Sequence, residues 1–156
     1  MNYVQIANVQ YPLFHKLMDA YYREGEDAET PQEEIDGFIQ LLYDHCLQGR
    51  IHGCVAWDGE PVGFVLWNVD SPEGVFCQKP GFGTILEIGI SKEFRGKGFG
   101  CELAEFALSQ MSVSQYYVFA YGPAEDFWKK CGFWDSGTIA ENGLKIYERQ
   151  SKGFEG

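Results

Sequence analysis

Basic residues are scarce in this chain of 156 residues, which carries 12 Lys and Arg against 23 Asp and Glu and has a net charge of −11. Because the phosphates of nucleic acids are bound by basic surfaces, this deficit argues against a nucleic-acid partner. No apolar run approaches the roughly 20 residues needed to cross a bilayer, so we expect no membrane partner. The first ten residues also lack a basic stretch followed by an apolar one, so we expect no secretory signal.

Cysteine and histidine are present, but not at the spacings that predict a disulfide framework or a metal centre. The five cysteines are odd in number and include no Cys-x-x-Cys pair. We therefore expect reduced thiols and a cytoplasmic location. The three histidines have no Cys or His partner at a ligand spacing, so the sequence predicts no metal.

Apolar and aromatic side chains are abundant, at 45% and 16% of the residues. This composition is that of a folded protein, and the length suits one domain over residues 1–156 with a sizeable core. The sequence has no repeats, linkers or low-complexity tracts. The acidic balance fits a cationic or amine-bearing partner, but it fits equally well a role in solubility alone.

Hydrophobic periodicity predicts the element order β-α-α-β-β-β-α-β-α-β-β. The first strand is expected over residues 3–9, and Pro12 opens the first helix. A second helix begins at Pro31 within a capping box that runs from Thr30 to Glu33. Its buried stripe is expected to comprise Ile35, Phe38, Ile39, Leu42 and Cys46.

Two hairpins are predicted further along the chain. Runs at 51–57 and 62–69 flank an Asp-Gly pair, and runs at 138–140 and 144–149 flank an Asn-Gly pair. An apolar run at 85–90 predicts a buried central strand. The order of strands and helices predicts an α+β fold in three layers, with a mixed, mostly antiparallel central sheet and helices on both faces.

The most informative stretch is residues 86–111, LEIGISKEFRGKGFGCELAEFALSQM. An apolar strand is followed by a polar corner, by the alternating glycines Gly96, Gly98 and Gly100, and by a helical pattern. Glycines permit positive φ and close backbone approach, and the first N–H groups of a helix have no acceptor within it. Because the helix dipole and nearby basic residues add positive charge, this stretch predicts a pyrophosphate site.

The spacing of the glycines distinguishes between three known kinds of phosphate-binding loop. A Walker A loop places Ser or Thr after its Lys, whereas Lys97 is followed by Gly98. A dinucleotide fingerprint reads Gly-x-Gly-x-x-Gly in the first strand–helix turn, whereas this chain reads Gly-x-Gly-x-Gly in its second half. The pattern that fits is Arg-x-x-Gly-x-Gly at Arg95, Gly98 and Gly100, between a strand and a helix.

This pattern resembles the acetyl-CoA-binding motif of the GNAT superfamily of N-acetyltransferases. Residues 124–133, AEDFWKKCGF, are similar to a later motif of that family, and the predicted element order also suits it. The resemblance implies that acetyl-CoA is the co-substrate, with its pyrophosphate on the glycine loop and its pantetheine arm along the preceding strand. The implied cofactor-binding residues are Ile88, Gly89, Ile90, Arg95, Gly96, Lys97, Gly98, Phe99, Gly100, Phe127 and Trp128.

Acyl transfer to an amine needs a base, and Glu87 is the first candidate. It lies within an apolar strand, where burial raises the pKa of a carboxyl, but strand alternation does not decide which face it takes. The family often uses a Tyr acid where this chain has Trp128, whose indole is not a practical acid. Tyr121 is the substitute candidate, and the alternatives are a packing role for this residue and protonation by water.

The resemblance thus implies an N-acetyltransferase that acts on the primary amine of a cationic small molecule or peptide. A second hypothesis, motivated by Trp128 and Tyr121, is a non-catalytic acyl-CoA-binding sensor or interaction domain. A nucleotide-binding protein suits the loop less well. Family analogy permits a homodimer, and the sequence does not identify the acceptor.

Overall fold

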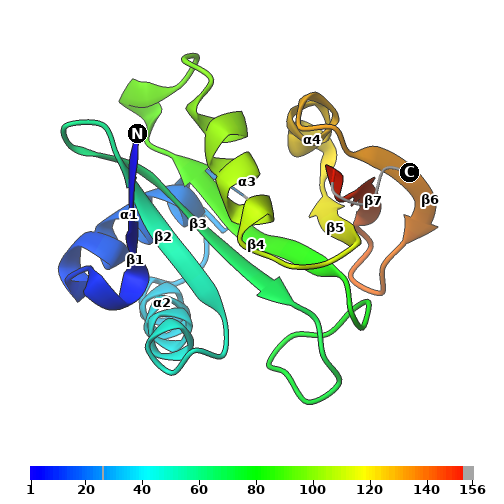
Figure 1. Ribbon diagram of the computed structural model, residues 1–156. Helices are drawn as coiled ribbons and strands as arrows, with labels where there is room; N and C mark the ends of the chain where they lie inside the picture. Colours follow the sequence, from blue (N-terminus) through cyan, green and yellow to red (C-terminus); the bar gives the residue numbers. More distant parts are fainter. Residues whose placement is uncertain (26, 153–156) are drawn as a thin grey trace.

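The computed structural model describes residues 1–25 and 27–152 (Figure 1). Its strands are β1 (Asn2–Gln5), β2 (His52–Trp57), β3 (Pro61–Val69), β4 (Gly83–Ile90), β5 (Gln115–Ala120), β6 (Trp134–Ile139) and β7 (Lys145–Gln150). Its α-helices are α1 (Tyr11–Glu24), α2 (Gln32–Leu47), α3 (Phe99–Ser109) and α4 (Glu125–Lys130). This is the element order that the periodicity predicts. Among the described residues, no helix has the length and apolar character needed to cross a membrane.

One sheet contains the seven strands in the order β1-β2-β3-β4-β5-β7-β6. Neighbouring strands are antiparallel except β4 and β5, which run parallel. The β2–β3 and β6–β7 turns contain Gly59 and Gly143 at φ of +77° and +84°, as expected for Asp-Gly and Asn-Gly hairpins. The predicted α+β fold with a mixed, mostly antiparallel sheet is therefore confirmed.

Helices cover both faces of the sheet (Figure 1). On one face, Phe14 of α1 and Ile39 of α2 share an apolar cluster with Phe64 of β3. On the other face, Leu103 of α3 shares a second cluster with Val65 of β3. Adjacent residues of β3 thus enter opposite cores because successive side chains of a strand alternate between faces. Burial of such side chains contributes roughly 1.5–3 kcal/mol each to folding.

The sheet divides between β4 and β5. Within the part of the chain that the structure describes, the two strands pair only at Gly83 and Thr84 of β4. Residues 85–90 of β4 and 118–120 of β5 therefore face the division without a partner strand across it. A Cβ added at Gly83 would lie 2.8 Å from the sulfur of Met111 and 3.0 Å from a ring carbon of Tyr116, so a larger residue would displace side chains at the point where the two halves still meet.

Two predicted element boundaries are wrong. The first strand ends at Gln5 rather than at residue 9, and a 3-10 turn over Ile6–Asn8 follows it. The N-cap of α2 is Pro31, which makes no side-chain cap bond, and the Thr30 hydroxyl lies 3.5 Å from Asp27 instead. The capping box fails because the helix starts one residue later than that motif requires.

The buried stripe of α2 is also narrower than predicted. Phe38 is 40% exposed and packs its ring against that of Tyr22, with 5.7 Å between centroids. Cys46 is half-buried, whereas His45 is only 8% exposed. The helix is rotated so that Phe38 lies outside the apolar cluster on this face and contacts α1, which periodicity within one helix does not reveal.

The buried carboxylate of Asp70 holds together the long loop between β3 and β4. It is 2% exposed and accepts hydrogen bonds from the N–H groups of Gln78 at 2.7 Å and Lys79 at 3.0 Å. It also accepts bonds from the Asn68 amide at 3.0 Å and the Tyr117 hydroxyl at 2.6 Å. This loop therefore reaches from β3 to β5 and closes one end of the sheet.

Candidate functional site

The segment between β4 and α3 contains the glycines that the sequence singles out. The N–H of Ser91 donates to the carbonyl of Val62 at 2.8 Å and holds the end of β4 on β3. Gly96 and Gly98 have φ of +80° and +82°, a region that L side chains rarely adopt. Gly98 is the N-cap of α3. These glycines therefore turn the chain directly from the strand into the helix.

The turn presents a row of backbone donors. Among the described residues, the N–H groups of residues 96–101 donate no hydrogen bond of regular geometry, and the first bond of the helix joins Glu102 to Gly98 at 3.3 Å. These N–H groups point away from the helix at its positive end. The predicted anion site is thus supplied with several donors.

Gly100 is required for a different reason. A Cβ there would lie 2.9 Å from a ring carbon of Phe127, closer than such atoms approach without displacement. The start of α4 therefore packs against the first turn of α3. The two stretches that carry the sequence motifs, residues 95–100 and 124–133, are consequently in contact.

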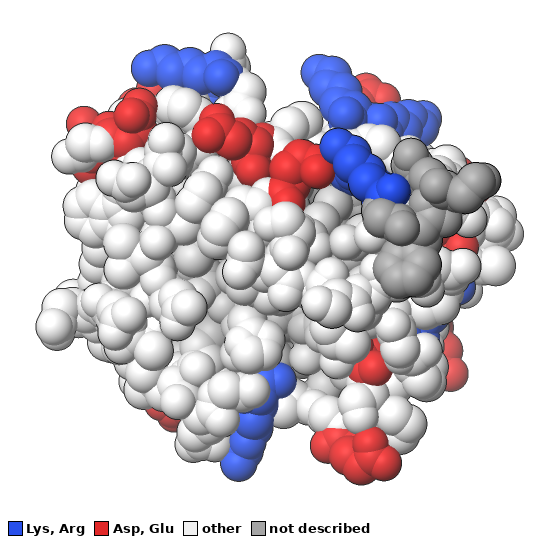
Figure 2. Space-filling view, in the orientation of Figure 1, with Lys and Arg blue, Asp and Glu red and all other residues white. Residues whose placement is uncertain are grey.

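The side chain of Arg95 is engaged within the protein. Its Nη2 lies 2.5 Å from Oε2 of Glu24, and its Nε donates to the carbonyl of Ile90 at 2.9 Å. Glu24 therefore balances the charge of Arg95, which ties the loop to the ends of α1 and β4. In Figure 2, basic side chains occupy two places along the upper edge, where Figure 1 shows the 91–98 segment and α4.

Glu87 lies in the part of β4 that has no partner on β5. Leu66 of β3 pairs with Glu87, but the next residue, Trp67, pairs with Ile85. Leu86 is thus an extra residue, a β-bulge. The bulge turns Leu86 and Glu87 to the same face, the one covered by α1. The sequence does not decide which face Glu87 takes, because strand alternation alone does not reveal a bulge.

Two tyrosines at the end of α1 surround Glu87. The Tyr22 hydroxyl donates to Oε1 of Glu87 at 3.3 Å. Burial raises the pKa of Glu87 to about 7, and hydrogen bonds from Tyr21 and Tyr22 offset part of this rise. Burial also raises the pKa of both tyrosines, so they stay protonated as donors. A carboxyl with a pKa near neutrality can accept a proton at physiological pH.

Tyr121 follows β5 on the other side of the division and is half-buried. The pKa of Tyr21 is raised first by burial and then by the charge of Glu87, and Tyr121 lies near enough for its charge, when ionised, to raise it further. The two phenols therefore lie near each other. Trp128, by contrast, is 5% exposed and packs between Phe127 and Phe133, with centroid distances of 4.9 and 5.3 Å. It lies in the core, and Phe127 is the half-exposed member of the pair.

Sequence reasoning missed the residues of α1 that complete this arrangement. Tyr22 is 65 positions from Glu87, and Glu24 is 71 positions from Arg95. No local motif contains them, because only the packing of α1 on the sheet brings them near β4. Two adjacent tyrosines on the last turn of the helix are the one sequence feature that draws attention to this region.

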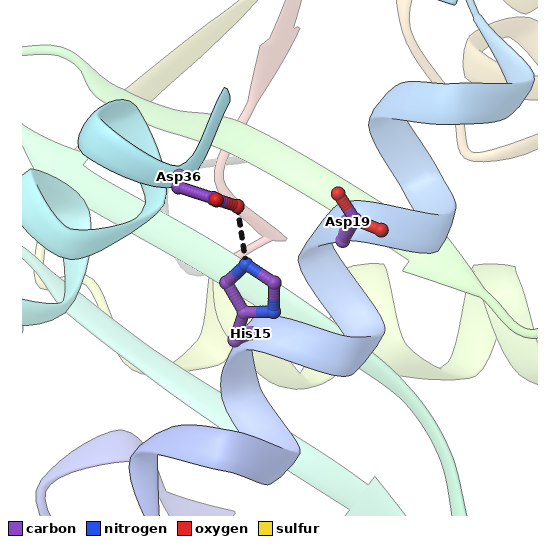
Figure 3. Close-up of side chains that lie close together, drawn as sticks. All are labelled: His15, Asp19 and Asp36. Carbon is purple, nitrogen blue, oxygen red and sulfur yellow. Dashed lines mark hydrogen bonds and ion pairs between the residues drawn. The ribbon is translucent and has the colours of Figure 1, made fainter. Parts of the chain in front are cut away.

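A cluster of His15, Asp19 and Asp36 joins α1 to α2 (Figure 3). Nε2 of His15 lies 2.7 Å from Oδ1 of Asp36, and the Gln32 amide donates to both carboxylates at 2.8 Å. One potential ligand atom from each residue lies within 4.8 Å of the others. Arg23 donates to the Gln32 side chain at 2.8 Å and extends the network. We interpret these bonds as a brace between the two helices.

A surface hollow lies at the other end of α3, against β1 and β2. Its lining includes Tyr3, His52 and Phe106, and the ring of His52 stacks on that of Trp67. None of the predicted site residues lines this hollow. We therefore place the candidate site at the glycine loop, which offers N–H donors to an anion, and at Glu87, which can accept a proton. The hollow is not part of it.

Residues 11–133 match the family described as the acetyltransferase (GNAT) family. The chain belongs to this family. The predicted resemblance to the GNAT family is thereby confirmed, and membership of this family supports acetyltransferase activity with acetyl-CoA as the co-substrate. No curated protein matches the chain by sequence.

Solved structures agree with the GNAT fold. A GNAT-family protein from Desulfovibrio desulfuricans has a TM-score of 0.72 and 14% identity, with 96% of this chain and 98% of that one covered. An acetyltransferase from Thermus thermophilus has a TM-score of 0.68 and 20% identity, with 90% of each chain covered. The PaiA N-acetyltransferase from Thermoplasma acidophilum, in complex with coenzyme A, has a TM-score of 0.66 and 14% identity, with 97% of this chain and 100% of that one covered.

Proposed function

We propose that this GNAT chain transfers the acetyl group of acetyl-CoA to the primary amine of a cationic small molecule or peptide. The observation that carries the proposal is Glu87, whose pKa is raised by burial to about 7, on the strand that leads into the glycine loop. A base in that position can take the proton of an ammonium group at neutral pH, and only the neutral amine is a nucleophile.

The glycine loop supports the placement of the cofactor. Its N–H groups at 96–101 suit a pyrophosphate, and the unpartnered edge of β4 suits a pantetheine arm bound like an added strand. The backbone N–H of Ser91 points toward β3, and the backbone groups of successive residues in a strand point to alternate edges. The backbone groups of Ile88 and Ile90 therefore point to the edge of β4 that faces away from β3. An N–H there would stabilise the oxyanion of the tetrahedral intermediate.

The steps assigned to this chain's side chains are proton transfers. Glu87 accepts a proton from the acceptor ammonium, and the resulting amine attacks the thioester carbonyl. Collapse of the intermediate breaks the carbon–sulfur bond, and the CoA thiolate takes a proton from Tyr121 or from water. The position of Tyr121 across the division from Glu87, near Tyr21, supports its candidacy as the acid.

Acidic side chains beside the end of α1 support a cationic acceptor. Glu33 and Glu34 lie exposed in the first turn of α2, and Asp27 and Glu29 are exposed in the preceding turn. Asp27 is near enough to Glu87 for its charge to raise the pKa of that carboxyl. A positively charged acceptor would therefore be attracted toward the side of the sheet on which Glu87 lies.

The test is release of CoA thiol with a panel of polyamines, aminoglycosides, amino acids and peptides, together with neutral amines and alcohols of matched size. We expect release with cationic amines and a product that resists hydroxylamine, as an amide does and an acetyl ester does not. Turnover of alcohols alone, or an ester product, would contradict N-acetylation. Binding of acetyl-CoA without release for any acceptor would favour a non-catalytic acyl-CoA sensor, the hypothesis motivated by Trp128 and Tyr121.

A further inference from the structure

Two cysteines from separate elements meet beside the glycine loop. Sγ of Cys131, at the end of α4, lies 3.2 Å from Sγ of Cys101, in the first turn of α3. Both are free thiols and belong to the apolar cluster on the α3 face. Among the described residues, no other pair of cysteine sulfurs lies within hydrogen-bond distance. A disulfide, with its sulfurs about 2.05 Å apart, would require an approach of only about 1.1 Å.

We propose that Cys101 and Cys131 form a reversible intramolecular disulfide that weakens the binding of acetyl-CoA to the adjacent glycine loop. The oxidant is a peroxide. The half-exposed Cys101 thiol releases its proton, and the thiolate attacks a peroxide oxygen; the O–O bond breaks, and the departing hydroxide takes up the released proton, which leaves a sulfenic acid and one water. The sulfur of Cys131 then attacks the sulfur of Cys101, the S–O bond breaks, and the departing hydroxide takes the Cys131 proton as water. Two thiols and hydrogen peroxide thus give one disulfide and two waters.

The environments of the two thiols fix this order of attack. Cys131 is 5% exposed, and burial, followed by the bond to Cys101, raises the pKa of its thiol. It is therefore poorly suited to meet an oxidant first, since the thiolate is the reactive form. Its carbonyl accepts a bond from Arg149 at 2.8 Å, which holds the end of α4 in place as the resolving partner.

The contact between Gly100 and Phe127 couples the disulfide to the loop. Gly100 precedes Cys101, and the N–H of Cys131 donates to the carbonyl of Phe127 at 3.1 Å. The Phe127 ring packs against Gly100 so closely that an added Cβ would lie 2.9 Å from it. We therefore expect an approach of the sulfurs to be transmitted to the first turn of α3, where the free N–H donors lie.

The experiment treats the full chain with hydrogen peroxide and maps disulfides in peptides prepared without reductant. We expect a Cys101–Cys131 linkage, the loss of two hydrogens in the intact mass, and reversal by dithiothreitol. Cys101→Ser and Cys131→Ser should each abolish the linkage, while Cys77→Ser, at an exposed cysteine, should leave it unchanged. Linkage through other cysteines, or none, would overturn the proposal.

Calorimetry on the reduced and oxidised chain tests the coupling, which rests on the proposed acetyl-CoA site. We expect oxidation to weaken acetyl-CoA binding on the order of tenfold and Cys101→Ser to make the affinity insensitive to peroxide. Equal affinity of the two forms would overturn the coupling. If neither form bound acetyl-CoA, the proposed function would fail, while the peptide map would still decide whether the disulfide forms.

Discussion

At the scale of single residues, Glu87 is the position on which the proposed chemistry depends. With a pKa of about 7, its carboxyl changes charge near neutral pH. We expect the rate of acetyl transfer at low acceptor concentration to rise with pH through about 7 in the wild type. Glu87→Gln should lower the rate by about 10²–10⁴-fold and remove this limb of the pH profile. Thiol release measured from pH 5.5 to 9 provides the comparison, and an undiminished rate would refute the assignment of the base.

The same pKa predicts a pH dependence of stability that does not require substrate. The folded chain holds the Glu87 proton up to about pH 7, whereas an unperturbed carboxyl releases it near 4.5. The contribution of the neutral Glu87 carboxyl to the free energy of unfolding is therefore complete below pH 4.5 and is lost as the pH rises to about 7. In this window the melting temperature of the wild type should fall relative to that of Glu87→Gln. Parallel curves for the two proteins would contradict the raised pKa.

At the scale of elements, the loop between β3 and β4 depends on Asp70. An amide at this position replaces one acceptor oxygen by an NH2 group, which in either orientation faces buried donors: the Asn68 amide, or the N–H groups of Gln78 and Lys79. We expect Asp70→Asn to lower the free energy of unfolding by about 2 kcal/mol or more, because buried donors lose their acceptor. Urea denaturation measures the difference. Asp58→Asn, at the exposed β2–β3 turn, is the control and should stay within about 0.5 kcal/mol of the wild type.

The elements themselves were predictable wherever a pattern is local. The Asp-Gly and Asn-Gly hairpins, Pro12 at the start of α1 and the glycines before α3 all act through neighbouring residues, and the structure confirms them. The exposure of Phe38 was not predictable, since it depends on how α2 is rotated against the sheet. The side taken by Glu87 was equally hidden, because the bulge at Leu86 is defined only by the register with β3.

At the scale of the whole molecule, the order of elements and the two motifs sufficed to predict the GNAT fold. The division between β4 and β5 was not predictable from either strand, since each strand has a partner along its other edge. The bond between Arg95 and Glu24 likewise arises from the docking of α1 near the glycine loop. The sequence therefore predicts the parts of the candidate site on β4 and α3, but not those that α1 contributes.

The measurement that tests the central claim most directly is calorimetric binding of acetyl-CoA to the wild type and to Gly98→Val. A valine at φ +82° would distort the row of N–H donors, so we expect wild-type binding at micromolar acetyl-CoA and a loss of at least about tenfold in the variant. Gly59→Val, at φ +77° in the β2–β3 turn, carries similar backbone strain away from the loop and should retain wild-type affinity. Absence of acetyl-CoA binding by the wild type, or equal affinity of the Gly98→Val protein, would contradict the account.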